Sequence, residues 1–499
     1  MARDHLLVID QGTTSTRAVV YDHQARPLGQ GQVEVPPSYP QPGWVEHDPK
    51  ALIDSVEPTV VLALREAGIG VGRLAGLGIT NQRETTIIWE RATGQAIGPA
   101  LVWQDRRTAD FCERHRDRRE WLAERTGLVL DPYFSATKMA WLLDHVPGAR
   151  QQAATGKLAA GTVDSLLIWH LTGGKRHVTD VTNASRTLLM GLHSLQWAKD
   201  LCDFFEVPPE ILPQILPSSG SMGQTLGLDF LPDGLPIAGV AGDQQASLVG
   251  QGCLAAGQAK CTYGTGAFLL VHTGAEVVPS TRGLVTTLAA TLGDGPPQYA
   301  LEGSVFVAGA AVQWFRDGLK AVGAAPEIDR LALDADPASE VLFVPALTGL
   351  GAPHWEPEAR GTMFGLTRAT SVADLARATL EGVAFQVADL IDAMNADLPT
   401  PLSDLRVDGG MARSDPFLQF QANLLGLPLR RSPQAESTAL GAALLAGLGV
   451  GLWPDPTSAA ELLQAGGQLF TPRHDDAWRS STMGRWQRAV ETVKRHYRG

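Results

Sequence analysis

The stretch Leu6–Asp22, LLVIDQGTTSTRAVVYD, decides the fold of the N-terminal region. An apolar run ends at Asp10, a polar turn rich in Gly and Thr follows, and a second apolar run covers Ala18 to Tyr21. Two short apolar runs around a polar turn are typical of a β-hairpin. The sequence therefore predicts a strand, a tight turn and a second strand at the start of the chain.

The residue types in this turn point to a phosphate. Gly and Thr let backbone N–H groups approach an anion closely. Thr13, Thr14 and Ser15 add hydroxyl donors, and Arg17 can neutralise charge that develops on a terminal phosphoryl group. Asp10 can hold Mg²⁺ through water, because magnesium keeps several waters. The alternative interpretation is an ordinary hairpin with a polar tip.

A second copy of this design occurs in AKCTYGTGAFLLVHT, residues 259–273, where Thr265 and Gly266 form the turn. Two such hairpins facing each other can hold one triphosphate from both sides. Two copies of one strand–turn–strand unit, far apart in the chain, predict two domains of similar architecture. We place them at residues 1–250 and 251–499.

The composition excludes several classes of protein. A formal net charge of −12 argues against a nucleic-acid-binding surface, and the four Cys residues form no CxxC pair, which favours free thiols in a reducing compartment. No secretory signal and no membrane span are expected, since the most apolar stretch, 439–453, is short and rich in Gly. We therefore expect a cytoplasmic protein. No GxxxxGK[ST] motif occurs, which excludes a P-loop kinase.

Three further places next to apolar strands carry candidate functional residues. Asp243 ends PIAGVAGD and suits a general base for an alcohol, although an isolated Asp in that position is more often a helix N-cap. Arg83 and Glu84 follow LAGLGIT and can bind neighbouring hydroxyls of a polyol; the alternative is a surface ion pair. The paired glycines Gly409 and Gly410 suit close approach to a nucleotide, or a tight strand–helix turn.

The remaining pattern predicts an alternation of helices and strands. The Pro- and Gly-rich residues 31–49 are expected to form an ordered loop. Helices are expected over 50–67, 108–126, 135–145, 196–206, 304–317, 371–395 and 414–425.

Two longer stretches resemble the signatures of a known family, the FGGY carbohydrate kinases within the actin-like ATPase superfamily. They are YFSATKMAWLLDH, residues 133–145, and GTMFGLTRATSVADLARATLEG, residues 361–382. The resemblance covers nearly the whole chain. It implies an α/β fold of two actin-like ATPase (ribonuclease H-like) domains with a catalytic cleft between them.

Shorter stretches resemble those family members that phosphorylate glycerol, among them ITNQRETTIIW, VWQDRRT and AGDQQASLVGQG. This resemblance implies transfer of the γ-phosphoryl group of ATP to glycerol, which yields sn-glycerol 3-phosphate. Asp243 would then be the catalytic base. The implied glycerol site consists of Arg83, Glu84, Trp103, Tyr133, Asp243, Gln244 and Phe268. The implied nucleotide site consists of Thr13, Thr14, Ser15, Arg17, Thr265, Gly266, Gly309, Gln313, Gly410 and Ser414, with Asp10 near Mg²⁺.

The chain departs from the family pattern in two places. Ser414 stands where the family usually has Asn, so a shorter hydroxyl is expected to contact adenine less directly. The loop GLDFLPDGLP, residues 227–236, lacks the Gly-Gly-Thr-Arg stretch of relatives that fructose 1,6-bisphosphate inhibits, and it lacks the His that some relatives use for phosphorylation control. We expect weak or absent regulation by both routes.

Two other functions compete with glycerol phosphorylation. One is phosphorylation of another polyol or of a ketose. The other is a nucleotide-dependent switch or chaperone, since actin-like ATPases include both, but such a protein has no need of a polyol site. Relatives form dimers and tetramers, so a homodimer or homotetramer is expected.

Overall fold

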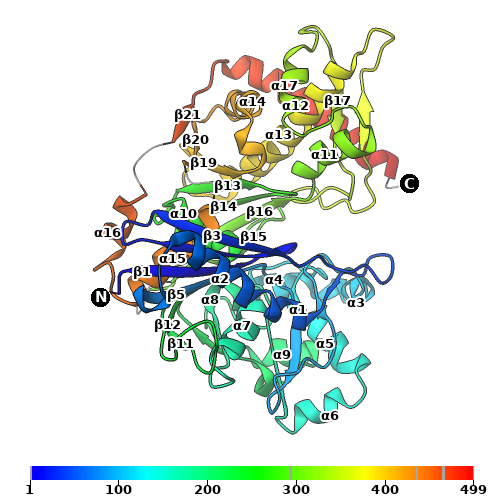
Figure 1. The fold of residues 1–499 in the computed structure, drawn as a ribbon. Coiled ribbons are helices and arrows are strands. Elements are labelled where there is room, and N and C mark those ends of the chain that lie inside the picture. Colours follow the sequence, from blue (N-terminus) through cyan, green and yellow to red (C-terminus); the bar gives the residue numbers. More distant parts are fainter. Residues whose placement is uncertain (1–2, 292–294, 434–435, 464–466, 498–499) are drawn as a thin grey trace. The chain divides into compact units, whose positions relative to one another are not determined.

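The structure is a computed structural model that describes residues 3–291, 295–433, 436–463 and 467–497 (Figure 1). It divides into two compact units. Unit 1 comprises Met1–Gly252, Thr286–Tyr299 and Ser437–Ala465; unit 2 comprises Cys253–Val285, Ala300–Glu436 and Gly466–Gly499. Two segments from beyond residue 250 therefore belong to the N-terminal unit. The division of the chain at residue 250 stays a prediction.

Unit 1 is an α/β unit. Its strands are β1 His5–Gln11, β2 Ser15–Tyr21, β3 Pro27–Glu34, β4 Glu46–His47, β5 Leu74–Asn81, β6 Ile87–Glu90, β7 Ala100–Leu101, β8 Leu158–Gly161, β9 Val178–Asp180, β10 Gln214–Leu216, β11 Ser219–Gln224 and β12 Pro236–Gly242. Its helices are α1 Pro49–Asp54, α2 Val56–Ala67, α3 Ala109–Arg114, α4 Arg119–Thr126, α5 Ser135–His145, α6 Ala149–Ala154, α7 Val163–Leu171, α8 Val181–Ala184, α9 Lys199–Phe205, α10 Asp243–Gly250, α15 Ser437–Gly449 and α16 Pro456–Glu461.

The main sheet of unit 1 has the order β11-β12-β5-β1-β2-β3. The predicted hairpin is confirmed, since β1 and β2 pair antiparallel with Asp10 opposite Arg17. Strands β12, β5 and β1 run parallel to one another. Their carboxyl ends therefore meet at one edge of the sheet, which is where open α/β sheets bind ligands.

Helix α15 completes this unit from far along the chain and lies beside α10 in Figure 1. Glycines make the close approach of the two helices possible: a Cβ at Gly441 would lie 1.8 Å from the Ala246 oxygen, and one at Gly250 would lie 1.9 Å from the Ser437 oxygen. Residues 439–446 of α15 are all buried. The most apolar stretch of the chain, 439–453, therefore begins as a buried helix.

Unit 2 is also an α/β unit, and it carries a second predicted hairpin. Its strands are β13 Ala259–Tyr263, β14 Ala267–Gly274, β16 Tyr299–Val305, β17 Leu342–Val344, β18 Thr362–Phe364, β19 Leu405–Gly409, β20 Leu429–Arg431 and β21 Gln468–Phe470; β15 is Val285–Leu288. Its helices are α11 Gly309–Gln313, α12 Glu327–Leu333, α13 Val372–Asp397, α14 Asp415–Leu425 and α17 Asp476–Tyr497.

Within this unit the sheet has the order β16-β14-β13-β19-β20-β21. The hairpin β13–β14 is confirmed, with Thr262 opposite Phe268, and β13, β19 and β20 run parallel. A capping box of Ser371 and Asp374 begins the long helix α13. Its Phe385 stacks on Trp486 of α17 with ring centroids 5.1 Å apart.

Some predicted elements are wrong at their boundaries. The expected loop over 31–49 contains the end of β3 and all of β4. Strand β3 escaped prediction because its glycines have low strand propensity, yet Gly31 is required: its Cβ would lie 2.2 Å from the Thr59 oxygen of α2. The helix expected over 304–317 begins only at Gly309, because β16 continues to Val305 through pairing in the sheet.

Two other predicted helices are interrupted. The helix expected over 50–67 divides at Ser55, which lies between α1 and α2. The helix expected over 108–126 contains a 3₁₀ turn at Arg116–Arg118 between α3 and α4. The helix over 135–145 matches α5 at both ends.

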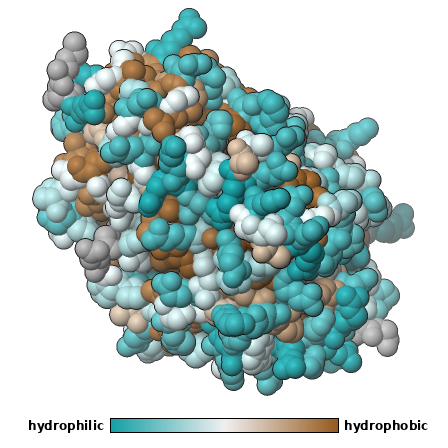
Figure 2. Space-filling view, turned by 90° about the horizontal axis from the view of Figure 1, so that it is seen from below, coloured by the Kyte–Doolittle hydropathy of each residue, from teal (hydrophilic) through white to brown (hydrophobic). Residues whose placement is uncertain are grey.

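The surface and the cysteines agree with the composition. On the face shown in Figure 2, apolar residues form separate patches among polar ones. In the described ranges, every helix is too short or too polar to cross a membrane. All four Cys residues are buried and free of disulfides, as expected. Burial raises the pKa of the Cys253 and Cys261 thiols to about 12.

A buried acid in unit 1 is expected to make stability depend on pH. Asp164 accepts hydrogen bonds from Thr162 Oγ1 (2.5 Å) and Thr179 Oγ1 (2.7 Å). Burial, and next the charge of Asp180, raise the pKa of Asp164 from 3.8 to about 7. The folded state binds the proton of the Asp164 carboxyl more tightly than the unfolded state does, so protonation of Asp164 stabilises the fold. This stabilising contribution is complete below pH 3.8 and is lost as the pH rises through about 7.

We therefore expect Asp164→Asn, which removes the charge, to gain stability relative to the wild type as the pH rises. The advantage should grow by about 2 kcal/mol between pH 5.5 and pH 8.5, since one pKa unit corresponds to about 1.4 kcal/mol. Denaturant unfolding of both proteins at the two pH values measures it. An advantage that shrinks or stays constant with pH would contradict the assignment.

Candidate active site

The candidate site lies where the three parallel strands of unit 1 end. Asn81, the last residue of β5, is the register partner of both Gln11 on β1 and Gly242 on β12. The predicted residues follow directly: the phosphate turn after β1, Arg83 and Glu84 after β5, and Asp243 after β12. The topology thus brings together three motifs that are far apart in the sequence.

The turn after β1 is closed by a hydrogen bond from Gly12 N to Ser15 O (2.9 Å). Trp103 Nε1 donates to Thr13 Oγ1 (3.0 Å), which ties the turn to the side chain predicted to cover a substrate. Thr14 is exposed at the tip. Gln32 on β3 holds the far side, since its Nε2 donates to Ser15 Oγ (3.0 Å) and its Oε1 accepts from Arg17 Nη2 (3.4 Å).

The buried surroundings of Asp10 disfavour the ionised form of its carboxyl group. Burial raises the pKa of Asp10 to about 6, Arg17 opposes this rise, and the charge of Asp243 adds to it. A divalent cation would favour the ionised form, so the carboxylate fits the predicted magnesium position. Within residues 3–291, 295–433, 436–463 and 467–497, no group of three or more His, Cys, Asp or Glu could hold a metal ion. Mg²⁺ needs only one or two carboxylates when phosphates and waters complete its shell.

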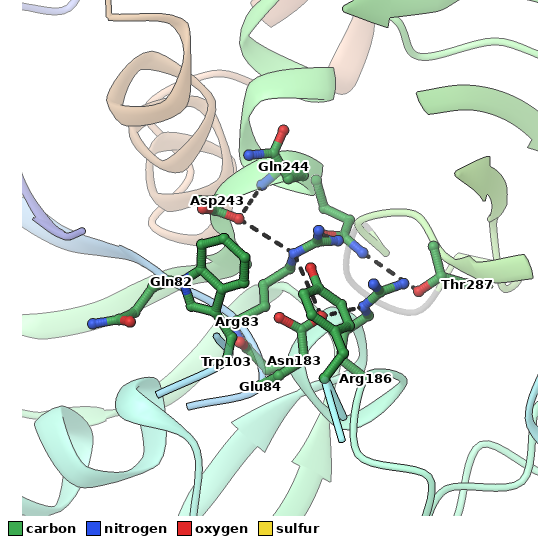
Figure 3. Close-up of polar contacts among 12 residues, drawn as sticks. Gln82, Arg83, Glu84, Trp103, Asn183, Arg186, Asp243, Gln244 and Thr287 are labelled. Atoms are coloured by element: carbon green, nitrogen blue, oxygen red, sulfur yellow. Dashed lines mark hydrogen bonds and ion pairs between the residues drawn. The ribbon is translucent and has the colours of Figure 1, made fainter. Parts of the chain in front are cut away.

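Arg83 and Glu84 are 2% and 1% exposed, so the alternative of a surface ion pair is wrong. Glu84 has a φ of 60°, an uncommon backbone conformation for a residue other than Gly. Arg83 Nε lies 4.0 Å from Glu84 Oε1 and 3.3 Å from Asp243 Oδ1. Figure 3 shows the Arg83 guanidinium reaching from the loop after β5 toward Asp243.

Asp243 is the first residue of α10, and the alternative that it caps the helix is wrong. The N-cap is Gly242, and Asp243 Oδ1 accepts from Gln244 N (2.7 Å). A carboxylate in the first helical turn is stabilised by the helix dipole. The Asp243 side chain is 32% exposed, although Arg83 and Gln244 beside it are buried. A partly open carboxylate held by a fixed guanidinium can accept a proton from a bound hydroxyl group.

Aromatic rings form one wall beside these charges. Trp103 and Tyr133 meet edge to face, with ring centroids 5.7 Å apart. The Tyr133 loop is held from below by the fully buried Lys138, whose Nζ donates to the carbonyl oxygens of Pro132 (2.9 Å), Tyr133 (2.6 Å) and Phe134 (3.0 Å). Burial lowers the pKa of Lys138 to about 8.

The sequence prediction missed two side chains that hold this site. Arg186 is 1% exposed, and its Nε donates to Glu84 Oε1 (2.6 Å) while its Cζ lies 5.7 Å from the centre of the Tyr133 ring. Gln245 Oε1 accepts from Arg83 Nη1 (3.2 Å), and its Nε2 donates to Leu288 O (3.2 Å). The signal for Arg186 was weak: one charge in the otherwise uncharged stretch VTNASRTLLM.

In unit 2, the predicted nucleotide residues surround the turn after β13. Ala308 N donates to Thr265 O (2.9 Å) and Gly309 N donates to Gly264 O (2.9 Å), so this turn is bonded to the start of α11. A Cβ at Gly309 would lie 2.6 Å from the Gly264 oxygen, and one at Gly266 would lie 2.5 Å from a backbone oxygen of β16. Gln313 ends α11 and is exposed.

The neighbouring strand brings the glycine pair to the same edge. Gly409 ends β19 opposite Tyr263 and has a φ of 90°. It is followed by Gly410, where a Cβ would meet no atom within 4 Å. Ser414 caps α14: its Oγ accepts from Phe417 N (3.2 Å) and donates to Asp329 Oδ1 (2.7 Å). The contact of Ser414 with a nucleotide stays a prediction. Phe268 lies on β14 of this unit.

Comparison with known proteins agrees with this geometry. Residues 5–250 match the N-terminal domain and residues 259–450 the C-terminal domain of the FGGY family of carbohydrate kinases. The chain is 53% identical over 487 residues to a glycerol kinase of Alkalilimnicola ehrlichii, covering 97% of each chain. It is 51% identical over 492 residues to a glycerol kinase of Aromatoleum aromaticum, covering 98% of this chain and 99% of the relative.

The fold of the chain also matches that of a solved glycerol kinase structure. The crystal structure of Plasmodium falciparum glycerol kinase with ADP superimposes with a TM-score of 0.92 at 36% identity, covering 99% of this chain and 98% of that one. The expected two-domain α/β fold of the actin-like type is thereby confirmed. The chain belongs to the FGGY family of carbohydrate kinases, in the branch of the glycerol kinases.

Proposed function

We propose that this protein transfers the γ-phosphoryl group of ATP to a terminal hydroxyl of glycerol and releases sn-glycerol 3-phosphate and ADP. The observation that carries the proposal is the Asp243 carboxylate, 3.3 Å from the buried Arg83 guanidinium and itself 32% exposed. Such a group has a fixed position and room for a substrate hydroxyl. The identity of more than 50% to proteins named glycerol kinases supports glycerol as the acceptor.

The acceptor site combines a few fixed polar groups with an aromatic wall, as small-molecule sites do. Arg83 and Glu84 are proposed to bind adjacent hydroxyls, because a guanidinium donates and a carboxylate accepts. Tyr133 and Gln244 are proposed to assist them. The Trp103 ring covers the carbon chain, and Phe268 is proposed for the same role.

In the proposed reaction, Asp243 accepts the proton of the terminal hydroxyl as that oxygen attacks the γ-phosphorus and ADP departs. Arg83 keeps the carboxylate oriented before the transfer. The hydroxyl oxygen thus gains its bond to phosphorus as it loses its bond to hydrogen. Water must be excluded from the reacting atoms, since it would otherwise compete as the acceptor.

The donor is proposed to be ATP with Mg²⁺. Thr13, Thr14, Ser15 and Arg17 are proposed to bind its phosphates from unit 1. Asp10 would hold Mg²⁺, which, when bound, neutralises charge on the phosphates. In unit 2 the proposed nucleotide residues are Thr265, Gly266, Gly309, Gln313, Gly410 and Ser414. A location in the cytoplasm and a homodimeric or homotetrameric assembly are proposed on the family resemblance alone.

A panel of acceptors tests the function directly. Purified protein with ATP and Mg²⁺ is expected to form ADP fastest with glycerol, and ³¹P NMR is expected to identify the product as sn-glycerol 3-phosphate. Erythritol, ribitol, xylulose and gluconate serve as comparison acceptors. A higher kcat/KM for any of them would reassign the substrate. ADP formation that does not depend on any acceptor would favour a nucleotide switch.

A further inference from the structure

A buried carboxylate behind the candidate site connects two of its strands. Asp180 ends β9, caps the short helix α8 and is fully buried. It accepts hydrogen bonds from Thr182 N (3.0 Å), Thr182 Oγ1 (2.8 Å), Asn183 N (2.9 Å), Asn183 Nδ2 (2.9 Å) and Ser218 Oγ (2.7 Å). All of these groups donate hydrogen bonds, so the pocket fits a carboxylate, which only accepts them.

The first connection from Asp180 reaches the end of β12. Because the Thr182 hydroxyl donates to Asp180, its lone pairs face outward and accept the hydrogen bond of Gly242 N (2.9 Å). Gly242 is the residue immediately before Asp243. A side chain at Gly242 is excluded, since its Cβ would lie 2.6 Å from Arg83 Cγ. The backbone that carries Asp243 is therefore held between Thr182 and Arg83.

The second connection reaches the end of β5. The Asn183 and Asn81 side chains form a reciprocal amide pair, with Asn81 Nδ2 to Asn183 Oδ1 at 2.9 Å and Asn183 Nδ2 to Asn81 Oδ1 at 3.1 Å. Asn81 is followed by the loop that carries Arg83 and Glu84, and Asn183 lies next to these two charged residues (Figure 3). Asn81 and Gly242 are register partners, so one acid holds two adjacent strand ends.

We propose that Asp180 is a positioning residue for phosphotransfer: through Thr182 it sets the backbone that carries Asp243, and through Asn183 it sets the loop that carries Arg83 and Glu84. This inference rests on the proposed function for the role of Asp243. Asp180 itself is fully buried, so the proposed role needs no contact with either substrate. It acts by keeping the base and the hydroxyl-binding pair in register with each other.

The chemistry of the pocket explains why an amide cannot replace the acid. In Asp180→Asn, one carboxylate oxygen becomes an NH₂ group. On the side of Thr182 N the NH₂ would face a backbone donor, and on the side of Asn183 it would face a backbone N–H and a side-chain amide. Either orientation opposes donors to donors, and the strand ends must shift to relieve it. A shift of about 1 Å at reacting groups can cost about 100-fold in rate.

Asp164 provides a matched control in the same cluster. It is as fully buried as Asp180, whose charge raises the pKa of Asp164. Its side chain accepts hydrogen bonds from the hydroxyls of Thr162 and Thr179 and from the backbone N–H of Ser165. None of these three residues bonds Asn81 or Gly242 in the described part of the chain. Asp164→Asn therefore removes a buried acid without touching the strand ends.

The experiment compares kcat at saturating glycerol and ATP. Asp180→Asn is expected to lower kcat by about 10- to 100-fold, whereas Asp164→Asn stays close to the wild type. In an Asp243→Asn background, adding Asp180→Asn should cost little further rate, because the two residues act on one step. Equal losses in the two single variants, or a full additional loss in the double variant, would overturn the proposal.

A second pair of variants covers the case in which Asp180→Asn does not fold. Thr182→Val removes the hydroxyl that holds Gly242 and should lower kcat, whereas Thr182→Ser restores the hydroxyl and most of the rate. Hydrogen exchange measures the positioning without catalysis: Asp180→Asn or Thr182→Val should speed exchange in peptides around 79–84 and 239–244, and Asp164→Asn should not. Unchanged exchange in these peptides would refute the positioning role. If exchange changes as expected but the wild-type protein is inactive on every acceptor, the proposed function is refuted instead.

Discussion

Replacing Asp243 with Asn is expected to lower kcat by roughly 10²–10⁴-fold, the usual contribution of a general base. The amide has the size of the carboxylate but cannot accept the hydroxyl proton. Glycerol binding should change little, because Arg83 and Glu84 remain buried in place. Steady-state kinetics with glycerol and ATP varied in turn separates kcat from KM.

The control for this prediction is Asp54→Asn. Asp54 is an exposed acid of unit 1 that pairs with Lys50 on α1, so its loss should leave kcat unchanged. If Asp243→Asn keeps near wild-type kcat, Asp243 is not the base. If it instead raises the glycerol KM with kcat intact, Asp243 binds substrate without taking its proton.

Replacing Arg186 with Gln is expected to raise the glycerol KM by about two orders of magnitude and to lower the unfolding temperature. Arg186 Nε donates to Glu84 Oε1 at 2.6 Å, and both side chains are 1% exposed. Removing one partner of a buried ion pair costs about 3–5 kcal/mol, because the remaining charge stays out of water. Glu84 would then rely on Arg83 at 4.0 Å and lose the orientation proposed for binding hydroxyls.

Arg125→Gln is the matched control for this variant. Arg125 Nε likewise bonds a carboxylate, that of Asp200 at 2.7 Å, but both side chains are well exposed. Exposed pairs contribute about 0–1 kcal/mol, so Arg125→Gln should change neither KM nor unfolding. Glycerol titrations and thermal unfolding of the two variants make the comparison. Equal behaviour of the two would show that burial of the Arg186–Glu84 pair has no functional weight.

Local pattern was sufficient for the two hairpins and for many helices. Each hairpin is an apolar run, a turn of Gly and Thr and another apolar run, and both pair antiparallel in the structure. Helix α5 matches its predicted bounds because its apolar residues repeat at helical spacing. These elements are determined by interactions among neighbours in the chain, which a sequence displays directly.

Local pattern was insufficient where a distant segment decides the structure. Gly29 and Gly31 weaken the strand signal of β3, yet α2 packs so closely on them that any side chain would clash. In the same way, nothing near residue 440 indicates that α15 belongs to the N-terminal unit. Helix α15 belongs to that unit because Gly441 packs against α10, which lies about 200 residues earlier in the chain. Contacts between such distant segments leave no local periodicity in the sequence.

The sequence by itself was enough to identify the family and to propose which residues bind phosphate, hydroxyls and a proton. Only the tertiary structure decided how those residues are held. It shows that Arg83 and Glu84 are a buried pair and not a surface pair, and that Asp243 lies in the first helical turn and not at the helix cap. It also shows that Arg186 bonds Glu84, and that Thr182, which bonds Asp180, also bonds the backbone before Asp243. Burial, charge pairing and strand register depend on residues far apart in the chain, so they exist only once the chain has folded.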